Sequence, residues 1–169
     1  MDVFEALHTR RSIRKYQKKE IPEDLIQKLL AAAMMAPSAG DARPWQFILV
    51  TDSEKKNKIK EVHPYVTMIT KAPLGIVVCG DLSKEKYPGF WPQDCSAAMQ
   101  NLLLAAHASG LGAVWTGIYP IEDRVVKIRE IFNLPDDIVP LGLAVLGWPA
   151  QSRPSEERYT DECVRYNTW

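Results

Sequence analysis

The chain has 169 residues, 46% hydrophobic and 25% charged; these ordinary values exclude disordered and fibrous classes, and the length suits a single domain over residues 1–169. Its 21 basic and 21 acidic residues cancel, so no broad field would attract nucleic acid or a membrane surface. With no membrane-length apolar run, no secretory signal and three scattered cysteines, the protein is expected in the reducing cytoplasm.

The first third of the chain is expected to be helical before a strand appears. Residues 3–9 form a short amphipathic pattern, and Ile21-Pro22-Glu23-Asp24 begins a second helix that Pro37 ends. Residues 46–51 (QFILVT) then predict a strand, and the charged run 53–61 predicts a solvated helix.

Strands and helices alternate in the remainder. Strands are expected at 74–79, 112–116 and 139–148, with helices at 92–109 and 121–132. The helix at 92–109 is apolar nearly all round, which favours burial in the protein or against a partner subunit. A helical start followed by this alternation predicts an α+β sheet with helices on both faces. Three large aromatics in the tail, residues 158–169, predict that it docks onto another surface.

A basic cluster follows the first helix. Arg10, Arg11 and Arg14 surround Ser12 within one short segment, together with Lys15. Guanidinium groups bind phosphate oxygens bidentately, and a hydroxyl can add a further bond. The cluster therefore predicts a site for a small anion such as a phosphate monoester. The alternative is a solvated basic surface, which short charge runs usually form.

Two loops could approach a ligand. Residues 36–45 (APSAGDARPW) place two prolines around small residues, which gives a stiff loop whose backbone a flat ligand could contact. Residues 115–120 (WTGIYP) follow a buried strand, where backbone N–H groups could stabilise developing charge. Each loop could equally be an ordinary connection between elements.

Several kinds of site are not predicted. The three histidines show no metal-ligand spacing with one another or with a cysteine, so no metal site is expected. The chain contains no P-loop, dinucleotide-fold or nucleophile-elbow motif. Cys95 begins a helix, a position that can lower the pKa of a thiol, but we assign it no catalytic role.

Taken together and in order, these segments resemble the FMN-dependent nitroreductase family in its short form. The resemblance rests on RRSIRKY, APSAGDARPWQF, QNLLLAAHASGLGAVWTG, VPLGLAVLGWP and the R-Y-x(6)-Y-x-x-W tail, and covers essentially the whole chain. It implies an α+β, nitroreductase-like three-layer α/β/α sandwich with a central mixed, mostly antiparallel sheet. It also implies a homodimer in which both chains line each FMN.

The resemblance further implies roles for individual residues. Arg10, Arg11 and Ser12 would hold the FMN phosphate together with Arg158, and Arg14 would lie near the pyrimidine end of the ring. The remaining residues would line the isoalloxazine: Pro37, Ser38, Ala39, Gly40 and Asp41 in the first loop, and the backbone N–H groups of Thr116 and Gly117 at flavin N5 and O4. Arg14, Thr116 and Gly117 would carry the catalytic, electrostatic roles.

The implied activity is hydride transfer from NAD(P)H through FMN to an electron-poor acceptor, such as a nitroaromatic or a quinone, by ping-pong turnover. Asp41 and Arg43 depart from the asparagine and glutamine usual in the family. If the Asp41 charge is free, it would lower the flavin potential. If Asp41 pairs with Arg43, its charge would be cancelled and the potential would not change. Alternatives are a dehalogenase or flavin-degrading relative, a non-catalytic flavin-binding or redox-sensing module, and an interaction protein whose basic cluster is surface only.

Overall fold

A four-stranded sheet forms the centre of the computed structural model, which describes residues 1–169. Its strand order is β1-β2-β4-β3, and every neighbouring pair is antiparallel. The strands are β1 (Trp45–Val50), β2 (Leu74–Asp81), β3 (Gly112–Gly117) and β4 (Ile138–Gly147). The helices are α1 (Val3–Thr9), α2 (Glu23–Met34), α3 (Ser53–Val62), α4 (Trp91–Ala108) and α5 (Glu122–Phe132), with short 3₁₀ turns between them.

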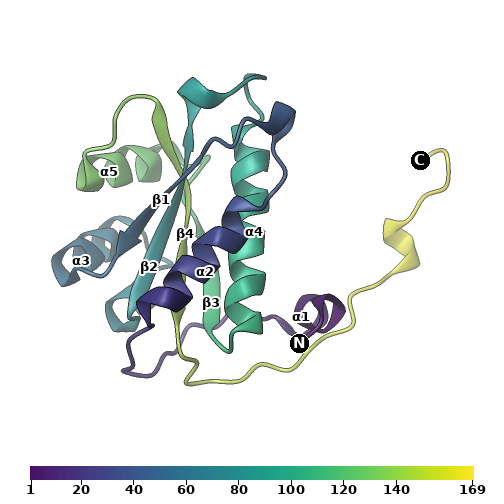
Figure 1. Ribbon diagram of the computed structural model, residues 1–169, viewed down its shortest axis with the longest axis horizontal. Helices are drawn as coiled ribbons and strands as arrows, with labels where there is room; N and C mark the ends of the chain where they lie inside the picture. The colour runs from purple at the N-terminus through teal and green to yellow at the C-terminus, as the bar shows by residue number, and fades with distance from the viewer.

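Helices cover both faces of this sheet. Helices α2 and α4 lie on one face, and α3 and α5 lie on the other (Figure 1). One core of 21 buried residues joins α2 and α4 to the sheet, and a second of 12 lies beneath α3 and α5. The expected α+β class with three layers is confirmed. The parallel contribution to the sheet is one isolated bridge between Ser12 and Ala113.

The apolar sequence runs account for the two central elements. Strand β2 is buried at every residue, as its uninterrupted run LGIVVC predicts for a strand covered on both faces. Helix α4 begins with Trp91-Pro92, and its Leu102, Met99 and Ala106 side chains are fully buried. No helix combines the length and apolarity that crossing a membrane requires.

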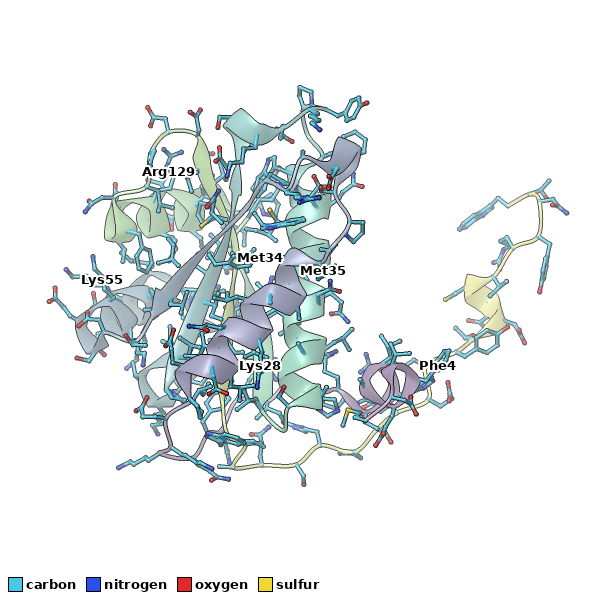
Figure 2. All side chains as sticks on the ribbon, viewed as in Figure 1. Phe4, Lys28, Met34, Met35, Lys55 and Arg129 are labelled. Atoms are coloured by element: carbon cyan, nitrogen blue, oxygen red, sulfur yellow. The ribbon has the colours of Figure 1, made fainter.

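Most of the tail does not dock onto its own chain. It runs away from the three layers (Figure 1), and Tyr159, Tyr166 and Trp169 are 70%, 85% and 101% exposed. Phe4 on α1 and Met35 at the end of α2, both labelled in Figure 2, are also exposed. Docking of the tail onto a second chain remains a prediction.

Candidate functional site

The N-terminal basic segment lies along the start of β3. The Ile13 amide donates to the Ala113 carbonyl at 3.0 Å, and Ser12 bridges Ala113 in parallel. A glycine at position 112 permits this approach, because a Cβ there would lie 2.5 Å from Cγ2 of Ile13. Since β3 is an edge strand paired only with β4, its outer edge is open beyond Ile13.

That open edge ends at Gly117. The Ala113 carbonyl faces outward to Ile13, and backbone groups alternate along an antiparallel strand. Trp115 and Gly117 therefore direct their amides outward, whereas the Thr116 amide faces β4. By this alternation the Gly117 amide lies on the open edge and the Thr116 amide does not; the flavin contacts expected of the two amides stay a prediction. The Thr116 hydroxyl also bonds inward, donating to the Leu143 carbonyl at 3.1 Å.

Two side chains hold the Gly117 peptide. Nε2 of His63 donates to the Gly117 carbonyl at 2.9 Å, and the Arg124 guanidinium donates to the same oxygen at 3.0 Å. Nδ1 of His63 accepts from the Tyr65 amide, which fixes the neutral Nε2–H tautomer. Burial lowers the pKa of His63, against the opposing effect of the Gly117 hydrogen bond. His63 and Arg124 carry no motif, so the sequence did not reveal them as positioning residues.

The phosphate-binding candidates gather near the start of the open edge. Arg10, Arg11 and Arg158 line one pocket of about 260 Å³ together with Glu156 and Glu157. Burial, followed by repulsion from Arg11 and Arg158, lowers the pKa of Arg10, and no side-chain hydrogen bond or ion pair engages its guanidinium. Arg158 pairs with Glu156 at 3.0 Å, and Arg11 donates to the Pro154, Glu156 and Arg10 carbonyls.

Arg14 lies apart from this pocket. It is exposed and lines a larger cavity of about 700 Å³ beside Tyr16. The segment thus places Arg10 and Arg14 at two different pockets, separated along the chain by Ser12, whose hydroxyl has no hydrogen-bond partner. This spread suits an elongated ligand better than a single small anion.

The 36–45 loop is held by the buried side chain of Asp94 in the first turn of α4. Asp94 is 6% exposed, and its Oδ1 accepts from the Ala39 amide at 3.0 Å. The Ser38 hydroxyl accepts from the Arg43 amide at 2.9 Å, and Lys86 donates to the Gly40 carbonyl at 2.6 Å. The loop is therefore a rigid platform. The Asp94 contact could not be predicted from local patterns, because 55 residues separate its partners.

Asp41 and Arg43 form a bidentate ion pair. Nε and the Nη2 atom of Arg43 lie 2.7 and 2.8 Å from the two Asp41 oxygens. This hydrogen bonding lowers the pKa of Asp41, which stays ionised. Both residues have positive φ, 54° and 50°, a conformation that stores backbone strain. Of the two possibilities left open for Asp41, the structure shows the paired one.

This loop and the basic segment lie at opposite ends of α4. Asp94 anchors the loop near the first turn, whereas His107 in the last turn contacts Thr9 of α1 at 2.7 Å. Thirteen residues of α-helix between them span about 20 Å. A single chain therefore keeps Pro37, Ser38, Ala39 and Gly40 away from Arg10 and Ser12.

Other reactive groups are unsuited to catalysis. Burial raises the pKa of the Cys79 thiol and of the Cys95 thiol to about 12 in each case, so burial outweighs any effect of the helix start on Cys95. No group of three or more His, Cys, Asp or Glu side chains is arranged to hold a metal ion.

Comparison with known proteins places this chain in a family. The model of the Nitroreductase family matches residues 7–65 and 61–148. A protein of Methanothermobacter thermautotrophicus, provisionally named NADH dehydrogenase/NAD(P)H nitroreductase, is 54% identical over 169 residues, covering 100% of this chain and 88% of that relative. The chain belongs to the nitroreductase family.

Solved nitroreductases share the whole fold. An FMN-dependent nitroreductase from Clostridium difficile R20291 matches with a TM-score of 0.91 and 28% identity, covering 99% of this chain and 100% of that one. A provisionally assigned nitroreductase from Desulfovibrio desulfuricans, solved in complex with FMN, matches with a TM-score of 0.86 and 26% identity over 100% and 98% of the two chains.

Proposed function

We propose that this oxidoreductase of the nitroreductase family uses bound FMN to carry hydride from NAD(P)H to an electron-poor acceptor, such as a nitroaromatic or a quinone. The two substrates would occupy the same place in turn. The observation that carries the proposal is the unpaired Arg10 guanidinium, gathered with Arg11 and Arg158 at the start of the open β3 edge.

The donor set suits the phosphate of FMN. Three guanidinium groups repel one another around one pocket, and a phosphate dianion would relieve that repulsion while accepting charge-assisted hydrogen bonds. The Ser12 hydroxyl is free to donate as well. Arg158 would exchange its exposed Glu156 partner for the phosphate; the present ion pair is a weak competitor because both side chains are over 60% exposed, at 67% and 62%.

The same edge offers groups for the ring. When bound, FMN supplies a ring that accepts hydride at N5 and passes it on. The Gly117 amide would donate a hydrogen bond at that edge of the ring, held in place by His63 and Arg124 through its carbonyl. Thr116 would support this position from within the sheet, and Arg14 would oppose negative charge at the pyrimidine end.

A second chain would complete the site. Because the 36–45 loop and the basic segment lie about 20 Å apart along α4, Pro37, Ser38, Ala39, Gly40 and Asp41 would reach the flavin of a partner subunit. The exposed side chains of Phe4, Met35 and the tail aromatics would be covered in the same dimer. We therefore propose a homodimer with two equivalent sites.

The flavin itself tests this proposal. The purified protein should be yellow and should release unmodified FMN on denaturation, at about one flavin per chain. The flavin released into the supernatant is identified by chromatography against FMN, FAD and riboflavin standards. Flavin that stays covalently attached, or a colourless protein that takes up no added FMN, would contradict the proposal and favour the interaction-protein alternative.

A further inference from the structure

Four cations surround the cavity that Arg14 lines. Arg14, Lys15, Lys60 and Lys71 come from the N-terminal segment, from α3 and from the 3₁₀ turn Thr67–Lys71, and enclose a cavity of about 700 Å³. Thr67 and Thr70 line it too, and no acidic residue does. In a chain of zero net charge, this is a local positive site rather than part of a basic surface.

These four cations lack partners, unlike their neighbours. On the same helix, Lys58 pairs with Glu54 at 2.6 Å, and the Lys56 ammonium donates to the Ala72 and Pro73 carbonyls at 2.8 and 2.9 Å. No ion pair or side-chain hydrogen bond engages Lys60 or Lys71. The cavity therefore offers charged donors that are free to bind an anion.

The position of the cavity indicates which anion. Arg14 lines this cavity and follows Arg10, Arg11 and Ser12 in the chain, so a ligand bound here would lie beyond the proposed flavin phosphate site, next to the end of the ring that Arg14 would face. An adjoining pocket of about 350 Å³ shares Thr70 and Lys71 with it, which gives room for an elongated molecule. The elongated ligand that must approach the ring is the dinucleotide donor. NADPH differs from NADH by one 2′-phosphate, which carries close to two negative charges.

We propose that Lys60 and Lys71, supported by Lys15, bind the 2′-phosphate of NADPH and make it the preferred electron donor, while Arg14 at the same cavity faces the flavin ring. This inference rests on the proposed function. Loss of one charge-assisted hydrogen bond of this kind corresponds to about a 10- to 100-fold loss of affinity. Lysine is suited to this role, because its ammonium binds phosphate as a point charge from a flexible stem.

Calorimetry on the flavin-loaded protein tests the site without turnover. The probes are 2′,5′-ADP, which carries the 2′-phosphate, and 5′-AMP, which lacks it. Wild type should bind 2′,5′-ADP at least about 10-fold more tightly, and the double variant Lys60→Gln/Lys71→Gln should lose that difference. The control variant Lys58→Gln should keep that difference. Lys58 lies two residues before Lys60 on α3, pairs with Glu54 and does not line the cavity. Equal binding of the two probes by wild type, or a difference that survives in the double variant, would overturn the proposal.

Anaerobic stopped-flow reduction gives the second measurement. The ratio of the rate constants for NADPH and NADH at limiting donor should favour NADPH in wild type and in Lys58→Gln, and should fall at least about 10-fold in the double variant. An equal loss with both donors would place the lysines on the shared pyrophosphate and overturn the assignment. If neither donor reduces the flavin, the proposed function is wrong. The phosphate site is then tested by the calorimetric comparison of 2′,5′-ADP and 5′-AMP alone.

Discussion

The carboxylate of Asp94 is expected to hold the 36–45 loop in place, and Asp94→Ala measures how strongly. Asp94 is 6% exposed and accepts from the Ala39 amide at 3.0 Å. Because this acceptor is a buried side chain that holds a backbone amide, its loss should cost about 1.5–3 kcal/mol of unfolding free energy. At about 2–4 °C per kcal/mol for a chain of this size, Tm should fall by roughly 3–12 °C. Affinity for FMN should fall as well, since the loop would line the partner's flavin.

Two control variants separate this hydrogen bond from other effects. Asp94→Asn keeps an oxygen acceptor and should lose only the charge, which is favourable near the start of α4 by about 0.3–1 kcal/mol. Gln93→Ala changes an exposed neighbour in the same turn and should leave Tm unchanged. Thermal denaturation followed by circular dichroism, with FMN titration by fluorescence quenching, gives both quantities. A change below about 0.5 kcal/mol for Asp94→Ala, or equal losses for the alanine and asparagine variants, would refute this role of Asp94.

Three further predictions concern the flavin site. Arg10→Ala should weaken FMN binding about 10- to 100-fold. Riboflavin, which lacks the phosphate, should bind the variant as tightly as it binds wild type. An equal loss of affinity for FMN and riboflavin in fluorescence titrations would show that Arg10 has a structural role instead. Deletion of Arg158–Trp169 should lower flavin content and dimer stability together in analytical ultracentrifugation, and a flavin-loaded monomeric wild type would contradict the dimer. Asp41→Asn should raise the flavin midpoint potential, because it leaves the positive charge of Arg43 unpaired. The double variant Asp41→Asn/Arg43→Gln should restore the wild-type potential. In spectroelectrochemistry, a shift below about 10 mV in the single variant would show that the pair lies too far from the ring.

The secondary structure could be predicted because hydrophobic periodicity follows burial. The apolar run of residues 74–79 became the fully buried strand β2, and the alanine- and leucine-rich run 92–109 became α4. The ends of these elements moved by only one or two residues. The order β1-β2-β4-β3 had no local signal, because the position of β4 between β2 and β3 depends on how the two cores pack.

The groups that position the site could not be predicted, because they act over long sequence separations. His63 reaches the Gly117 carbonyl across 54 residues, and Asp94 reaches the Ala39 amide across 55. Neither contact leaves a periodic pattern or a motif. Strand alternation also depends on the register of pairing, so the inward direction of the Thr116 amide became evident only once Ala113 was placed against Ile13.

The most direct test of the proposed function is anaerobic titration of the flavin-loaded protein with NADPH and NADH, followed by addition of a nitroaromatic or a quinone. We predict that the absorbance of oxidised FMN near 450 nm disappears at about one equivalent of donor per flavin, since this is a two-electron couple, and returns when the acceptor is added. A flavin that stays oxidised with either donor would contradict the account and identify the protein as a flavin-binding module without this activity.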